Sequence, residues 1–104
     1  MTYIFDIDGT ICTHAAPYYE NARPFVERIQ KINSLYDAGH TIIIETARGN
    51  VSGIDWYTST ENQLKTWGLK FHTLRTGVKH AADIYIDDKA LNADEFFYAV
   101  SMTP

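Results

Sequence analysis

Short apolar segments of strand character alternate along this chain with segments of helical periodicity. The segment HTIIIET, 40–46, is a run of β-branched apolar residues, and TYIFDI, 2–7, is mostly apolar on both faces. Between them, four apolar residues recur at the spacing of one helix face: Phe25, Ile29, Ile32 and Tyr36. Strands covered on both faces and joined through helices predict an α/β fold with a mostly parallel sheet and right-handed crossovers.

The second half of the chain continues this alternation. Thr58 and Glu61 have the spacing of a capping box, which predicts a short helix that runs to about Trp67. Asn92 is in position to cap a final helix. Two further strands are predicted from apolar segments: LKFHTL, 69–74, and ADIYID, 82–87. Two segments are predicted to be loops: 8–23 and 47–56.

The size and charge of the chain exclude several classes of protein. At 104 residues it is predicted to form one domain, 1–104, without room for a separate lid domain. No apolar run approaches the roughly 20 residues of a membrane span, so we expect no membrane partner. The 13 acidic residues outnumber the 9 basic ones, and no stretch gathers Lys and Arg. This balance disfavours nucleic acid as a partner.

The start of the chain and its cysteine content indicate in which cellular compartment the protein is expected. Met1 leads almost directly into a strand pattern, which leaves no room for a signal peptide. Cys12 is the single cysteine and cannot form an internal disulfide, as is typical of a reducing compartment. We therefore expect the protein to be cytoplasmic.

Polar side chains follow the predicted strands at the points where the strands end. The residues in question are Asp6, Asp8, Thr46, Asp87 and Asp88, with Lys79 in the turn before the last predicted strand. In an open parallel sheet, ligands bind outside the carboxyl ends of the strands. These side chains are therefore predicted to converge on one edge of the sheet.

A cluster of carboxylates at one edge indicates a cation. Several carboxylates within a few ångströms repel one another unless a positive ion lies among them. Oxygen ligands of this kind suit Mg²⁺, which commonly bridges carboxylates and phosphate. A hydroxyl group and a lysine beside the metal would form a cradle for a phosphoryl group, and an aspartate can act as the nucleophile in phosphoryl transfer. This chemistry is hydrolysis of a phosphate ester.

The segments YIFDIDGT, IIIET, Lys79 and IYIDDKA, in that order, resemble the four motifs of the haloacid dehalogenase superfamily of phosphohydrolases. The resemblance implies a Rossmann-like three-layer sandwich with a short, mostly parallel sheet. It also implies that Asp6 is the nucleophile, and that Asp8 is the general acid and then the base for the attacking water. Thr46 and Lys79 would hold the phosphoryl oxygens. A carboxylic acid two residues after the nucleophile is typical of the phosphatases of the superfamily.

The resemblance also implies the metal site. Asp87 would bind Mg²⁺, Asp88 would support it directly or through water, and Asp6 and the backbone carbonyl of Asp8 would complete the ligands. Arg48 lies close to Thr46 in the sequence. We expect Arg48 either to bind the anionic substrate or to pair with a surface acid.

More of the chain resembles small, capless members of this superfamily that are associated with the biosynthesis of capsule or lipopolysaccharide sugars. A sugar phosphate, or another small phosphate ester, is therefore the expected substrate. Without a cap, specificity must come from the segments 11–20 and 48–57 or from a neighbouring subunit. A homo-oligomer is therefore expected.

Three other interpretations remain open at this stage. Receiver domains use similar residues, but they place the acidic pair on the first strand, whereas here the pair comes last. An open site could also admit the 3'-phosphorylated end of a nucleic acid, which the net negative charge disfavours. A protein that binds a partner or phosphorylated ligand without catalysis would tend to lose its acids, and all of them are present here.

Overall fold

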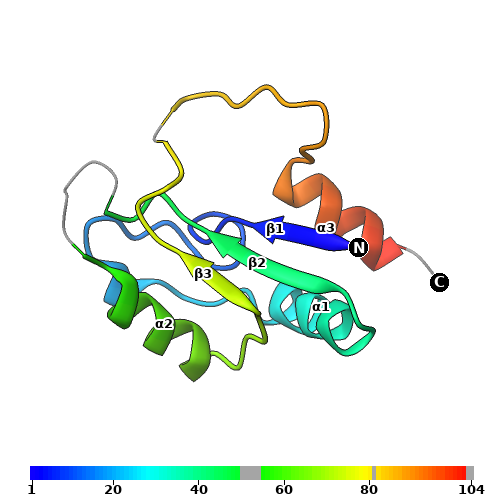
Figure 1. The fold of residues 1–104 in the computed structure, drawn as a ribbon, viewed down its shortest axis with the longest axis horizontal. Coiled ribbons are helices and arrows are strands. Elements are labelled where there is room, and N and C mark those ends of the chain that lie inside the picture. Colours follow the sequence, from blue (N-terminus) through cyan, green and yellow to red (C-terminus); the bar gives the residue numbers. More distant parts are fainter. Residues whose placement is uncertain (50–54, 81, 103–104) are drawn as a thin grey trace.

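The computed structural model describes residues 1–49, 55–80 and 82–102 (Figure 1). Within these residues, one sheet contains three strands: β1 (Thr2–Phe5), β2 (Thr41–Glu45) and β3 (Thr73–Arg75). The helices are α1 (Val26–Asp37), α2 (Tyr57–Thr66) and α3 (Ala93–Met102), and Tyr19–Asn21 forms a 3₁₀ turn, η1. Strands and helices alternate as the sequence predicts, up to the end of β3.

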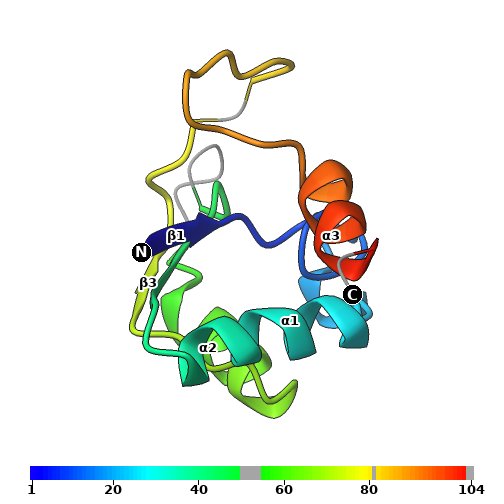
Figure 2. The same ribbon diagram turned by 90° about the vertical axis from the view of Figure 1, so that its right-hand side faces the viewer.

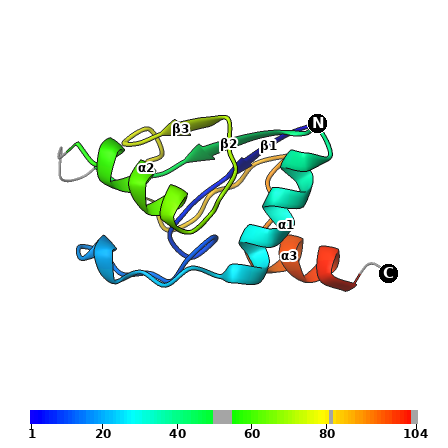
Figure 3. The ribbon, with the colours of Figure 1, turned by 90° about the horizontal axis from the view of Figure 1, so that it is seen from below.

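The sheet is parallel, and its order follows the chain. β1 pairs with β2 from Thr2 opposite Thr41 to Phe5 opposite Ile44, and β2 pairs in turn with β3. Figures 2 and 3 agree that α1, α2 and α3 lie on the same side of this sheet. The structure therefore confirms a small Rossmann-like α/β fold with a short parallel sheet. Its described helices form a single layer, so the described residues do not supply the third layer of the expected sandwich.

The core lies between the sheet and its helices. Ile42 and Ile44 of β2 point to this side and are fully buried, as is Ile32 of α1. Burying one such aliphatic side chain typically contributes about 1.5–3 kcal/mol to stability. Helix α3 joins the core through Phe96 and Phe97, whose rings pack against the aromatic side chains of β1. The opposite face of β1 is open, because Ile4 is 59% exposed.

The prediction of a fourth strand over 82–87 is wrong. These residues belong to an extended segment that leads from β3 to α3 and rises beyond the β1 edge of the sheet (Figures 1 and 2). The side chains of Ile84 and Ile86 are 76% and 96% exposed. Only six residues, 76–81, separate β3 from this segment, whereas a connection between parallel strands needs a dozen or more.

The capping box predicted for α2 is also wrong. Thr58 lies inside the helix, and the side chain that caps its first turn is Asp55, whose Oδ1 accepts a hydrogen bond from the backbone N–H of Tyr57 at 2.9 Å. The cap predicted for α3 is confirmed, because Asn92 Oδ1 accepts from the N–H of Asp94 at 3.0 Å. Part of the predicted loop 47–56, namely 50–54, lies outside the described residues.

Across the helices that the structure describes, none has the length and apolar character required to cross a membrane.

Candidate functional site

A tight turn at the carboxyl end of β1 places the first two acids. The backbone N–H groups of Thr10 and Ile11 both donate to the carbonyl of Ile7, at 3.0 and 2.8 Å. Ile7 itself is fully buried, so it anchors the turn in the core. Asp6 and Asp8 flank it and keep side chains that are 28% and 20% exposed. The strand therefore delivers both carboxylates to a partly open rim.

Gly9 is required in this turn for two reasons. Its φ is +84°, and a Cβ at this position would lie 2.3 Å from His14 Nε2. The left-handed conformation alone costs a residue with a side chain about 1–2 kcal/mol. The imidazole ring of His14 therefore lies directly against the backbone of Gly9, the residue that follows Asp8.

We expect Gly9→Ala to lower the free energy of unfolding by more than Gly39→Ala. Gly39 has a similar φ, +95°, but no atom lies within 4 Å of its added Cβ, so it reports the backbone cost alone. Urea unfolding of both variants measures the difference. The double variant Gly9→Ala/His14→Ala should recover the steric part, and equal losses in the two single variants would contradict this account.

Asp6 and Lys79 form the first charged pair of the site. Lys79 Nζ lies 3.4 Å from Asp6 Oδ2, and the two side chains are 33% and 28% exposed. The backbone N–H of Lys79 donates to the carbonyl of Thr46 at 3.5 Å, which fixes this residue at the carboxyl end of β2. A lysine and a carboxylate that are distant in sequence therefore meet at the predicted edge.

Asp8 forms the second pair, with Arg48. Arg48 Nε donates to Asp8 Oδ2 at 3.0 Å, and Nη2 donates to Oδ1 at 2.8 Å, so the contact is bidentate. The side chain of Arg48 is only 1% exposed. Two roles are expected for Arg48: binding the substrate or pairing with a surface acid. In this structure Arg48 pairs with an acid, but that acid is Asp8 of the candidate site. In this arrangement Arg48 positions Asp8.

Three residues that the sequence analysis did not identify hold Arg48 in place. Arg48 Nη1 donates to Gln63 Oε1 at 2.8 Å and to Thr60 Oγ1 at 3.3 Å, both on α2. The guanidinium carbon lies 4.3 Å from the ring centre of Tyr19, and Gln63 Nε2 donates to the Tyr19 carbonyl at 2.7 Å. These contacts span 12 to 44 residues of sequence, and no local pattern indicates them.

Thr46 lies beneath this network. It is 1% exposed, and its Oγ1 accepts a hydrogen bond from the backbone N–H of Arg48 at 3.1 Å. The described contact of Thr46 therefore stabilises the turn after β2. In this contact the Thr46 hydroxyl only accepts, so its own O–H remains a donor.

Burial and the negative charge of Asp8 raise the pKa values of two neighbouring side chains, Cys12 and Tyr19. Burial raises the pKa of the Cys12 thiol to about 12, and the carboxylate of Asp8 adds to the effect. At pH 9, roughly a thousandth of such a thiol is ionised, so Cys12 is a poor nucleophile. Burial and Asp8 also raise the pKa of the Tyr19 hydroxyl, against the opposing effect of Arg48.

Asp87 and Asp88 do not join the other acids in this chain. Both are exposed, and they lie on the segment that rises away from the sheet (Figures 1 and 2). Asp87 Oδ1 accepts from the backbone N–H of Lys89 at 2.7 Å, and this hydrogen bond and one from Asp88 lower the pKa of Asp87. Among the described residues, no group of three or more His, Cys, Asp or Glu side chains could hold a metal ion.

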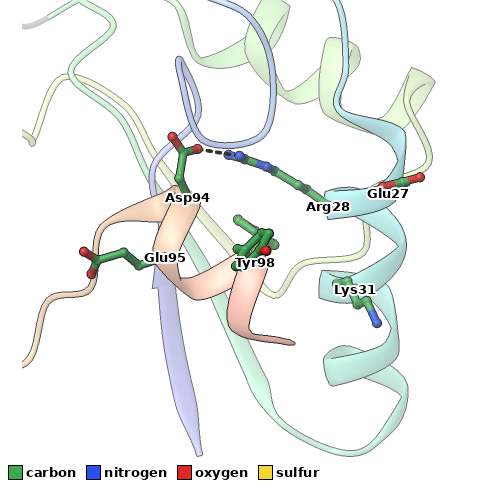
Figure 4. A pocket seen from close by; sticks show the side chains of 7 residues that line it. Glu27, Arg28, Lys31, Asp94, Glu95 and Tyr98 are labelled. Atoms are coloured by element: carbon green, nitrogen blue, oxygen red, sulfur yellow. Dashed lines mark hydrogen bonds and ion pairs between the residues drawn. The ribbon is translucent and has the colours of Figure 1, made fainter. Parts of the chain in front are cut away.

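A hollow of about 620 Å³ lies elsewhere, between α1 and α3 (Figure 4). Glu27, Arg28 and Lys31 line it from α1, and Asp94, Glu95, Phe97 and Tyr98 line it from α3. An ion pair between Arg28 and Asp94 crosses one end. None of the candidate site residues lines this hollow.

Comparison with known proteins supports the fold and adds no function. The chain is similar to a protein from Vibrio cholerae whose crystal structure was solved as an MCSG target, with a TM-score of 0.82 and 24% sequence identity. The match covers 92% of this chain and 86% of that one. No protein-family model matches the chain, and no curated protein matches it. The similarity therefore establishes a shared α/β fold.

Proposed function

We propose that this protein is a Mg²⁺-dependent phosphatase that hydrolyses a small phosphorylated metabolite, a sugar phosphate, through an aspartyl phosphate. The observation that carries this proposal is the pair of Asp6 and Lys79, whose charged atoms are 3.4 Å apart on a partly exposed rim. Lysine can bind the phosphoryl oxygens beside the carboxylate that attacks. Asp8 lies two residues away and is oriented by Arg48.

The proposed reaction has two steps. A carboxylate oxygen of Asp6 attacks phosphorus while the ester P–O bond breaks, and the leaving oxygen takes a proton from Asp8. Water then attacks the phosphorus of the aspartyl phosphate, Asp8 accepts its proton, and inorganic phosphate leaves Asp6 in its original state. The cycle begins and ends with Asp8 protonated, whereas both of its oxygens accept from Arg48 in this structure. Before the first step, Asp8 must therefore take up a proton from solvent and turn that oxygen toward the leaving oxygen.

A single chain gathers few ligands for the proposed metal ion. Mg²⁺ prefers several oxygen ligands, and the sequence offers Asp6, Asp8, Asp87 and Asp88. The described chain gathers only the first two, and the ligand expected from Asp8 is its backbone carbonyl, so Asp6 is the one acidic side chain there to hold the ion. The residues of a single chain therefore do not fit the ion as arranged here.

Phosphate release from a panel of substrates tests the proposal. The panel contains sugar phosphates, nucleotides and a 3'-phosphorylated oligonucleotide, each with Mg²⁺ and with a chelator. We expect release from at least one sugar phosphate in Mg²⁺, and its loss in chelator. Turnover of the oligonucleotide alone would favour a nucleic acid end phosphatase, and a folded protein that releases no phosphate from any substrate would contradict the proposal.

A further inference from the structure

One edge of the sheet and one strand-like segment are both left without a partner. Within the described residues, β1 pairs with β2 on one side and with no strand on the other. The segment 82–87 has the apolar alternation of a strand, yet every one of its described residues is exposed. An unpaired edge of a sheet is a template for the addition of another strand.

The ends of these two elements share one sequence pattern, three apolar residues followed by an aspartate. β1 and the residues after it read Tyr-Ile-Phe-Asp at 3–6, and the segment reads Ile-Tyr-Ile-Asp at 84–87. A parallel pairing that aligns these stretches puts Asp87 level with Asp6 at the carboxyl end of β1. It also covers exposed apolar side chains, Ile84 and Ile86 on the segment and Ile4 on the strand.

The chain's own segment cannot make this pairing while Lys79 is in the site. Lys79 is held at the carboxyl end of the sheet by its contacts with Asp6 and the Thr46 carbonyl. A strand over 82–87 that ends level with Asp6 must begin roughly 16 Å back, toward the amino end. Three residues from Lys79 reach at most about 10–11 Å. In Figure 1 the segment accordingly runs back along the sheet, opposite in direction to β1.

We propose that a second copy of this chain supplies the missing strand, so that segment 82–87 of each copy pairs with β1 of the other. Each copy carries both the open edge and the unpaired segment, so a two-fold symmetric dimer satisfies both at once. Asp87 and Asp88 of one copy then lie beside Asp6 and Lys79 of the other. The dimer itself is independent of the activity, and the contribution of Asp87 to the site rests on the proposed phosphatase function.

Light scattering tests the assembly without any assay of activity. We expect the wild-type chain to be a dimer and the double variant Ile84→Asp/Ile86→Asp to be a monomer. Val26→Asp is the matched control, because Val26 is 59% exposed at the start of α1 and outside the proposed interface, and it should remain dimeric. A wild-type chain that stays monomeric at high concentration would overturn the proposal.

A disulfide tests which chain supplies the strand. In the proposed register, position 4 of one copy lies beside position 85 of the other. Oxidation of a mixture of Ile4→Cys and Tyr85→Cys chains should therefore link unlike chains, whereas each variant oxidised alone should give little product. Cys12 is buried and its raised pKa keeps it unreactive. No link in the mixture, or a link only within a chain that carries both cysteines, would overturn the pairing.

Complementation tests the shared site. Lys79→Ala and Asp87→Ala chains are each expected to be inactive, but a mixed dimer contains one site with both residues intact. After random exchange of subunits, the mixture should recover about one quarter of the wild-type activity, since half of the dimers are mixed and half of their sites are intact. Activity that stays absent in the mixture while the wild type is active would show a site built within one chain. If the wild type is inactive, the disulfide still decides the assembly.

Discussion

Replacing Asp8 with alanine is expected to lower the free energy of unfolding by about 3–5 kcal/mol, because it leaves the charge of Arg48 buried without its partner. The side chain of Arg48 is 1% exposed and donates two hydrogen bonds to Asp8. Small domains are stable by only about 5–15 kcal/mol, so this loss should be evident in urea unfolding.

A surface pair of equal length is the control for this prediction. Lys70 Nζ lies 2.8 Å from Asp37 Oδ1, the same distance as in the buried pair, but the two side chains are 49% and 58% exposed. Asp37→Ala should therefore cost about 1 kcal/mol or less. The double variant Asp8→Ala/Arg48→Met should be more stable than Asp8→Ala alone. Equal losses for Asp8→Ala and Asp37→Ala would show that burial of Arg48 does not matter.

Asp6→Asn is expected to reduce Mg²⁺-dependent phosphate release by about a thousandfold or more. The amide has nearly the same shape as the carboxylate but lacks the charged oxygen that attacks phosphorus, and loss of an activated nucleophile typically costs several orders of magnitude. Initial rates on the best sugar phosphate of the panel measure the effect.

Two comparisons show whether this loss is chemical. Asp37→Asn changes an exposed acid that pairs with Lys70, remote in sequence from the site, and it should retain wild-type activity. The thermal midpoint of Asp6→Asn should stay close to that of the wild type, because the contact of Asp6 with Lys79 is partly exposed to solvent. A folded Asp6→Asn protein with wild-type rates would remove Asp6 from the role of nucleophile.

The first part of the fold follows from local patterns. β1, β2 and α1 are predicted near their observed positions because each buries one apolar face within the chain itself, at strand or helix spacing. The segment 82–87 has an equally strong strand pattern, yet it forms no strand here. Whether a strand pairs depends on the connection that precedes it and on the edge it can reach, and a local pattern specifies neither of these.

In the candidate site, too, some features follow from the sequence and others do not. The positions of Asp6, Asp8 and Lys79 at one edge follow from the rule that functional groups gather at the carboxyl ends of parallel strands. The burial of Arg48 does not follow, because Gln63, Thr60 and Tyr19 surround it from distant parts of the sequence. The predicted place of Asp87 and Asp88 depends on a strand that one chain does not form.

The most direct test of the proposed chemistry is to trap the phosphorylated enzyme. The wild-type protein is mixed with its best sugar phosphate and Mg²⁺, quenched in acid within a single turnover, digested and analysed by mass spectrometry. The account predicts one phosphoryl group on the peptide that contains Asp6, and its absence from Asp6→Asn. Rapid turnover with the phosphoryl group on another residue, or with no phosphorylated peptide at all, would contradict it.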